Sequence, residues 1–317
     1  MPIAKVSPYD NGTVGKPINR ERYMIDLISS FITKSDNYDR IHGPIQHKIG
    51  IDHRVTVDGK GFVSRPLSLT VDQLVNDFPQ ARVTCTLQCA GTRRHTMRTR
   101  IKEVLGVDWQ DAALMTCVWE GPRVRDILLA AGAQDHCAMG DSVRPKHVHF
   151  ANYGGKTQAD EWYGGSIPFD RAMDPAMDVI LAVKQHDYKI LPPEAVCVET
   201  AEKYWARCPS MLDMPINSCV AHPTSNSTIV LLSSGMIEVL GYAVPQGAQG
   251  PVLRVQMSGD EGRTWTDAHL DHGCKDASRW TWSLWQAQIK MEKGKAKRIF
   301  AKAADAGGNT QTCERSS

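Results

Sequence analysis

The chain of 317 residues is predicted to combine a mixed α+β region with a β-sandwich that follows it. Up to about residue 210, candidate strands and helices interleave without strict alternation, which is typical of α+β folds. From about Met214 the pattern changes to short strands of alternating hydrophobicity, separated by turns that contain Gly or Asp. The length also exceeds that of one typical domain. We therefore expect an N-terminal extension over residues 1–36 and two domains, over 37–210 and 211–317.

Local patterns predict the elements of the first region. Apolar residues at helical spacing predict a helix in residues 21–31, and β-branched or alternating stretches predict strands. Thr70 followed by Gln73 has the spacing of a capping box, which marks the start of a helix. The expected elements are a helix with Tyr23, Leu27, Ile28 and Phe31 on one stripe, strands at 54–57, 83–87 and 179–183, and helices from Thr70 and over 123–131.

The second region shows the same kind of local signals. Asp260-Glu261-Gly262 is typical of a hairpin turn. The strands expected on either side and beyond lie at residues 237–242, 252–257, 280–284 and 298–303.

Composition excludes several classes of function. The formal net charge is +2, so no broad electrostatic attraction to nucleic acid or membranes is expected. No apolar stretch approaches the ~20 residues that cross a bilayer, and the N-terminal residues lack the apolar core of a secretory signal. Nine cysteines without regular spacing indicate reduced thiols. We expect an intracellular protein, cytoplasmic, with mitochondrial or peroxisomal location as alternatives.

Cys89 is the main candidate for chemistry. Its thiolate would be a soft ligand of the kind that suits redox-active transition metals, and Arg93 and Arg94 follow at once. Cations beside sulfur lower its pKa and can bind an oxyanion. The alternative is a small core cysteine beside two surface arginines. Cys85 has no partners at zinc-site spacing.

Two histidines form a weaker candidate for a metal site. His147 and His149 alternate in a strand-like context, so both are expected on one face. No third ligand is evident nearby, and we therefore give this pair little weight as a metal site.

Four groups of residues in chain order resemble motifs of one known family. They are TLQCAGTRR at 86–94, YGGSIP at 163–168 with RAMDP at 171–175, RIHGP at 40–44, and GRTW at 262–265 with WTWSLW at 280–285. The chain is similar in these places, from about residue 37 to 312, to the sulfite oxidase and assimilatory nitrate reductase family. Thr92 and Ile41 stand where the family usually has Asn. The resemblance implies a molybdopterin-binding (sulfite oxidase) fold followed by an immunoglobulin-like domain that carries the contact of a homodimer.

The resemblance also implies a site and a reaction. The cofactor would be Mo-molybdopterin, with the Cys89 sulfur as the metal ligand, and sulfite would be oxidised to sulfate in sulfur metabolism. An external acceptor, oxygen or cytochrome c, would take the electrons, because no cytochrome b5-like haem motif is found in this chain and no haem is expected. The family's substrate and pocket positions fall on Arg40, Arg94, Trp109 and Tyr188, and its cofactor contacts on Tyr38, Arg40, His42, Tyr163 and Ser166.

Three departures from the family pattern keep other functions open. The segment that holds the pterin phosphate in the family is expected to be deleted near residues 183–185. Gly154 stands near the position where the family usually has an aspartate that contacts the cofactor, so this contact is expected to be absent. The chain ends at Ser317, before the family's terminal motifs, so the sandwich is expected to be truncated. One alternative is a degenerate, cofactor-poor paralogue that acts as a dimerising or interaction protein. The other is a nitrate reductase-like molybdenum core.

Overall fold

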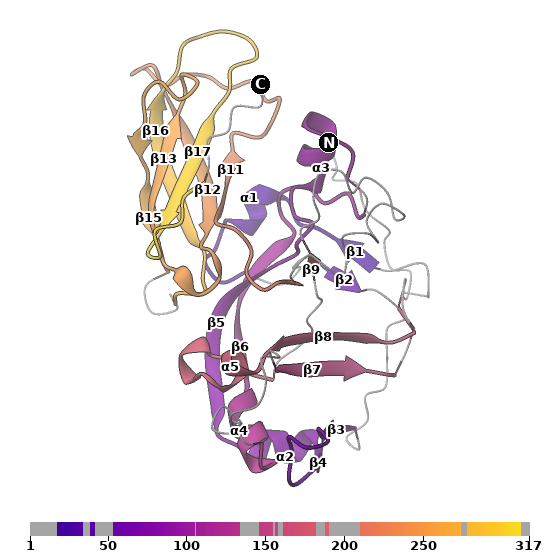
Figure 1. Cartoon of the computed structure of the whole chain (residues 1–317). Coiled ribbons are helices and arrows are strands. Elements are labelled where there is room, and N and C mark those ends of the chain that lie inside the picture. Colours follow the sequence, from indigo (N-terminus) through magenta and orange to yellow (C-terminus); the bar gives the residue numbers. More distant parts are fainter. Residues whose placement is uncertain are drawn as a thin grey trace.

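A computed structural model gives the arrangement of the chain (Figure 1). It describes residues 18–33, 39–41, 53–104, 106–133, 146–154, 156–157, 161–181, 188–189, 210–273 and 278–311. The predicted cofactor contacts Tyr38 and His42, and the expected deletion near 183–185, lie outside the described residues.

The first region consists of antiparallel strand pairs with short helices between them. Its strands pair as β1–β2, β3–β4, β5–β6, β7–β8 and β9–β10. Figure 1 shows β5 and β6 as a long ribbon between the C-terminal part and the helices at the opposite end. The elements are β1 Ile18–Arg20, α1 Met24–Leu27, β2 Asp39–Ile41, β3 Arg54–Val57, β4 Leu67–Thr70, α2 Val71–Asn76, β5 Gln80–Gln88, α3 Arg94–Arg100, β6 Leu114–Pro122, α4 Val124–Ala130, β7 His147–Asn152, β8 Tyr163–Pro168, α5 Phe169–Met173, η2 Pro175–Met177, β9 Tyr188–Lys189 and β10 Ser210–Met211.

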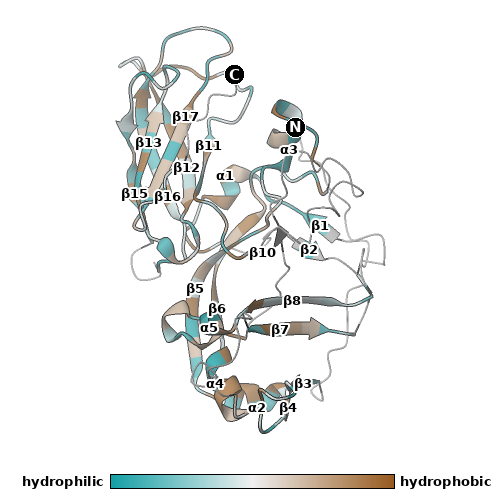
Figure 2. Cartoon of the chain, in the orientation of Figure 1, coloured by the Kyte–Doolittle hydropathy of each residue, from teal (hydrophilic) through white to brown (hydrophobic). Residues whose placement is uncertain are grey.

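Several local predictions are confirmed. The Thr70 hydroxyl accepts from the N–H of Gln73, and the Gln73 side chain accepts from the Thr70 N–H, so the capping box begins α2. Helix α4 begins after Arg123, and the strands predicted at 54–57 and 83–87 are β3 and part of β5. Figure 2 shows the hydrophobic side of α4 at the end of the molecule opposite the C-terminal part. There Val124 and Leu128 belong to a buried apolar cluster.

One prediction of this region was wrong, and another is confirmed only in part. The helix expected over 21–31 is the single turn α1, with Leu27 buried at 1% and Tyr23 46% exposed. Leu27, Ile28 and Phe31 of the stripe nevertheless pack in one apolar cluster, and the Phe31 carbonyl accepts from the ring N–H of Trp282. Of the strand expected at 179–183, the described part forms an isolated bridge between Ile180 and Arg123.

The C-terminal part consists of two antiparallel sheets, which we call the C-terminal sheets. Their orders are β11-β12-β16-β15 and β14-β13-β17. Both contribute to one apolar cluster, including Val239 and Trp285 from the first sheet and Val255 and Ala303 from the second. An immunoglobulin-like topology stays a prediction. The elements are β11 Asn217–His222, β12 Met236–Val244, η3 Gly247–Gln249, β13 Val252–Ser258, β14 Thr266–Asp267, β15 His269–Asp271, β16 Ser283–Lys290 and β17 Phe300–Asp305.

The turn predicted at Asp260-Glu261-Gly262 is confirmed, because it lies between the paired strands β13 and β14. The strand predicted at 280–284 begins only at Ser283. Trp280 and Trp282 instead contact β5: the Thr86 N–H donates to the Trp280 carbonyl over 2.9 Å, and the Trp282 N–H donates to the Thr86 hydroxyl over 2.8 Å. These residues therefore join the two parts of the molecule.

None of the helices in the described ranges is long and apolar enough to cross a membrane.

Candidate functional site

Cys89 lies directly after the last residue of β5, in a loop of residues 89–93 that we call the Cys89 loop. Its thiol is free and half-buried. The Cys89 N–H donates to the Ala113 carbonyl over 2.9 Å, and the Thr92 hydroxyl donates to the same oxygen over 2.8 Å. The Thr92 N–H closes the turn on the Cys89 carbonyl at 2.9 Å. The thiol therefore lies on a rigid loop at a strand end, a usual place for functional groups.

The segment of residues 109–113 holds the rest of this loop. The Arg93 N–H donates to the Gln110 carbonyl over 2.6 Å, and the His95 N–H donates to the Trp109 carbonyl over 2.9 Å. Arg93 itself has φ of 69°, which is in the left-handed region. The turn from β5 into α3 is thus determined by bonds to a neighbouring segment rather than by a regular element.

Arg94 is packed in a space that two glycines leave open. Its Nη1 donates to the Val107 carbonyl over 2.6 Å. A Cβ at Gly91 would lie 2.7 Å from Nη1, and one at Gly106 would lie 2.6 Å from it. Only residues without a side chain leave room for this guanidinium, whose remaining N–H groups could bind an anion.

Arg93 extends in the other direction, to the C-terminal sheets. Its Nη1 donates to Asn217 Oδ1 over 2.9 Å and to the Ser218 carbonyl over 3.0 Å, and its Nε lies 3.3 Å from Asp111 Oδ1. The two arginines of the motif therefore differ in role: Arg93 joins the loop to β11, while Arg94 lies against the loop itself.

Other thiols near the site are poor ligands. Burial raises the pKa of Cys219 to about 12 and that of Cys85 to about 11, so both are protonated near neutral pH. Thiolates are the metal-binding form. No group of three potential His, Cys, Asp or Glu ligands is found among the residues that the structure describes.

Residues 107–113 hold both ends of the site: the Ala113 carbonyl accepts from the Cys89 N–H, and the Val107 carbonyl accepts from Arg94, two residues before Trp109. Trp109 is 1% exposed, so its ring is buried as a core residue would be, and contact with a substrate stays a prediction. Arg40 lies on β2, where its Nη1 donates to Asn19 Oδ1 over 3.1 Å. Tyr188 lies on β9, where it is paired in register with Met211.

Tyr163 and Ser166 lie on the β7–β8 ladder, in register with Asn152 and His149. The prediction that His147 and His149 share a face is confirmed, since both are exposed on β7. The His147 ring nitrogen Nδ1 lies 3.0 Å from the Ser166 hydroxyl. Gly154, near the position where the family usually has an aspartate, lies between β7 and β8, shortly after the end of β7.

Sequence patterns missed three contributors. Gln88 Oε1 is buried next to Cys89 and has no hydrogen-bond partner among the described residues. The Glu21 carboxylate accepts from two N–H groups of the 109–113 segment. Gly106 makes room for Arg94. Gln88 stands within the motif, but its sequence position does not show that Oε1 is buried without a partner in the part of the chain that the structure describes. Glu21 and Gly106 lie outside the motif and act through contacts that no local pattern indicates.

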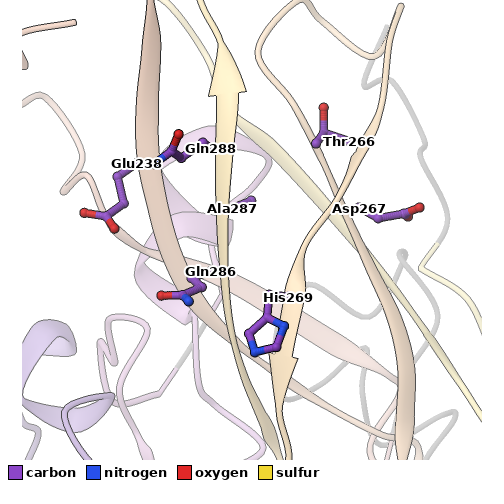
Figure 3. Close-up of a pocket in the computed structure, with 7 residues that line it drawn as sticks. All are labelled: Glu238, Thr266, Asp267, His269, Gln286, Ala287 and Gln288. Atoms are coloured by element: carbon purple, nitrogen blue, oxygen red, sulfur yellow. The ribbon is translucent and has the colours of Figure 1, made fainter. Parts of the chain in front are cut away.

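A depression of about 350 Å³ lies elsewhere, on the C-terminal sheets. Figure 3 shows its side chains spread over several strands without converging on a point. One of them, Asp267, is already paired with Arg254 over 2.7 Å. The depression therefore offers no chemistry comparable to that of the Cys89 loop. Its lining residues are Glu238, Thr266, Asp267, His269, Gln286, Ala287 and Gln288.

Comparison with known proteins identifies the family. The oxidoreductase molybdopterin binding domain matches residues 42–195, and the Mo-co oxidoreductase dimerisation domain matches residues 209–316. The sulfane dehydrogenase SoxCD from Paracoccus pantotrophus has a similar fold, with a TM-score of 0.66 at 20% identity, covering 98% of this chain and 80% of that one.

Relatives with similar sequences include sulfite oxidases and nitrate reductases. Sulfite oxidase of Gallus gallus is 31% identical over 93% of this chain and 71% of its own length. The mitochondrial sulfite oxidase of Homo sapiens is 32% identical over 93% of this chain, which spans 60% of that protein. A nitrate reductase [NADH] of Solanum lycopersicum is 28% identical over 93% of this chain and 38% of its own length. The resemblance of the sequence motifs is thereby confirmed, and the chain belongs to the sulfite oxidase and nitrate reductase family of molybdopterin oxidoreductases.

Proposed function

We propose that this protein oxidises sulfite to sulfate with a Mo-molybdopterin cofactor whose only protein ligand to the metal is the Cys89 sulfur. The observation that carries the proposal is the free, half-buried Cys89 thiol at the end of β5, fixed by the Ala113 carbonyl beside Arg94. When bound, the cofactor supplies two-electron oxygen transfer, and the protein supplies orientation and charge.

The donor set fits this cofactor. A thiolate is the soft ligand that such a metal prefers. The buried Gln88 Oε1, which lacks a partner among the described residues, could accept a hydrogen bond from an N–H group of a pterin. Tyr38, His42, Tyr163 and Ser166 are the further cofactor contacts that we propose from the family motifs.

Charge on the protein suits a small dianion. Arg40 and Arg94 are the proposed sulfite-binding groups, because a guanidinium can donate two hydrogen bonds to one oxyanion. Arg94 is oriented for this by its bond to Val107 and the space at Gly91 and Gly106. Trp109 would support the pocket from behind, and Tyr188 could donate its hydroxyl to an oxygen.

We further propose a homodimer formed through residues 211–317, an immunoglobulin-like domain, with residues 37–210 as the catalytic domain after an extension over 1–36. The dimerisation domain that matches 209–316 supports this. The electron acceptor would be external, oxygen or cytochrome c.

One observation favours a second candidate, a cofactor-poor paralogue that acts as an interaction protein. The alignment with the Gallus gallus enzyme runs over 343 positions, more than the 317 residues of this chain. The relative therefore has segments that this chain lacks. The proposed loss of the phosphate-binding segment would remove charged contacts worth several kcal/mol.

Molybdenum content separates the two candidates. The protein is expressed in a cofactor-competent host, and molybdenum per protomer is measured by elemental mass spectrometry, followed by turnover of sulfite and nitrate. We expect near-stoichiometric molybdenum in the wild type and in the control Cys85→Ser, and loss of sulfite turnover in Cys89→Ser but not in the control. A folded wild-type protein without molybdenum would refute the proposal. If the enzyme turned over nitrate but not sulfite, nitrate would be the substrate.

A further inference from the structure

The 109–113 segment has two hydrogen-bonding edges, and only one of them faces the Cys89 loop. On that edge the carbonyls of Trp109, Gln110 and Ala113 accept from the loop and from the start of α3. Any shift of this segment would therefore move the backbone of the loop. What fixes the segment thus matters for where the Cys89 sulfur lies.

Glu21 holds the other edge. Its Oε2 accepts from the Gln110 N–H over 2.8 Å, and its Oε1 accepts from the Ala112 N–H over 2.5 Å. Both carboxylate oxygens are thus used on alternate residues of one segment. Backbone N–H groups donate stronger hydrogen bonds to an ionised carboxylate than to a neutral oxygen, so this contact restrains the position of 109–113 most strongly above the pKa of Glu21.

The stretch that carries Glu21 is itself anchored. Leu27 of α1 is 1% exposed and belongs to the same buried cluster as Ala112, Leu114 and Tyr242. The Tyr242 hydroxyl donates to the Asp111 carbonyl over 2.8 Å. The stretch that carries Glu21 is therefore held in place by the packing of Leu27 in this cluster.

Burial of an acid at this place has a cost that its partners offset. Burial raises the pKa of Glu21 to about 7, with Asp111 and Asp108 adding to the increase while the N–H groups of Ala112 and Gln110 oppose it. A partly buried carboxyl is stable only where its oxygens find donors, and here those donors belong to the segment under the Cys89 loop.

We propose that Glu21 is a positioning residue: by binding the N–H groups of Gln110 and Ala112, it fixes the 109–113 segment and thereby the place of the Cys89 sulfur. That this sulfur is a molybdenum ligand rests on the proposed function. The positioning of the loop does not depend on it.

The variants are Glu21→Gln, which keeps one acceptor oxygen and turns an NH₂ group toward the other N–H, and Glu21→Ala, which keeps none. The matched control is Asp26→Asn, which removes an exposed acid a few residues away. Cofactor-free protein is examined by backbone hydrogen exchange and by site-resolved alkylation of Cys89. Molybdenum-loaded protein is examined by the sulfur-to-metal absorption band.

In Glu21→Ala, we expect exchange of the Cys89, Arg93 and His95 amides to rise about tenfold or more, the size expected for lost charged hydrogen bonds. Glu21→Gln should lie between it and the wild type. Cys89 alkylation should change in the same order, and the absorption band should shift, while Asp26→Asn matches the wild type throughout.

Unchanged exchange of the loop amides in Glu21→Ala would overturn the proposal. An equal rise in β12 and β16 would also overturn it, since that would mean general destabilisation. If wild-type protein binds no molybdenum but the loop readouts move as expected, the proposed function fails and the positioning role stands.

Discussion

The Cys89 loop and the β7–β8 ladder both carry proposed cofactor contacts, but they are held in different ways. The loop is bonded to Gln110, Ala113 and β11, all distant in sequence. In the ladder, the backbone groups of β7 and β8 pair with each other at six positions, from His147 with Pro168 to Asn152 with Tyr163, and one face of β7 is exposed. Geometry imposed by many separate parts is rigid, whereas a two-stranded ladder is marginal without packing. Substitutions should therefore cost more at the loop than at the ladder.

The largest effect is expected for Arg93→Ala. It removes the donors to Asn217 and Ser218 and the ion pair with Asp111, so partly buried acceptors lose a charged donor. We expect the free energy of unfolding to fall by about 3 kcal/mol, measured by urea denaturation. The free energy of unfolding of Arg93→Lys should lie between those of the wild type and Arg93→Ala, because lysine keeps the positive charge but lacks the planar guanidinium group. A loss as small as that of a surface substitution would remove the contrast between the two regions.

The pH dependence of stability should identify Glu21. Its folded-state pKa of about 7 lies above the ordinary value of 4.5, so the folded state binds the proton more tightly than the unfolded one. Stability from this group is therefore fully present below about pH 4.5 and is lost as pH rises to and through about 7. Urea denaturation should show this loss, on the order of 2 kcal/mol, in the wild type. Glu21→Gln should lack this component, and a parallel pH profile in that variant would contradict the assignment.

Gly106→Ala tests the space for Arg94. Gly106 has φ of +121°, and a Cβ there would meet the guanidinium, whereas Gly61 has φ of +81° with nothing within 4 Å. Both alanine variants should lose about 1 kcal/mol through backbone strain. Only Gly106→Ala should raise the sulfite KM, about tenfold, because it displaces Arg94 from Val107. Equal KM values for the two variants would exclude Arg94 as an oriented substrate group.

The smallest effect is expected for His147→Ala on the exposed face of β7. It loses only the contact with the Ser166 hydroxyl, so the free energy of unfolding should change by less than about 0.5 kcal/mol. Thermal denaturation of His147→Ala and Arg93→Ala under the same conditions compares their losses of stability directly. A loss close to that of Arg93→Ala would show that the ladder is held as firmly as the loop.

Features that depend on neighbours in the sequence could be predicted from it. The Thr70–Gln73 capping box, α4, and the strand that ends at Gln88 all follow from spacing and side-chain type. The Cys89 motif likewise placed a thiol beside two arginines. These predictions hold because capping bonds and strand alternation need only a few consecutive residues.

Tertiary contacts decided the rest. The helix expected over 21–31 is one turn, and Trp280 and Trp282 bind Thr86 instead of starting a strand. Glu21 binds a segment some 90 positions away, a partner that no local pattern can indicate. The sequence by itself determined the candidate thiol, the two arginines beside it, and the family to which the motifs belong. Only the tertiary structure decided that Arg93 joins the loop to β11 while Arg94 lies against the loop, because long-range hydrogen bonds set where each guanidinium lies.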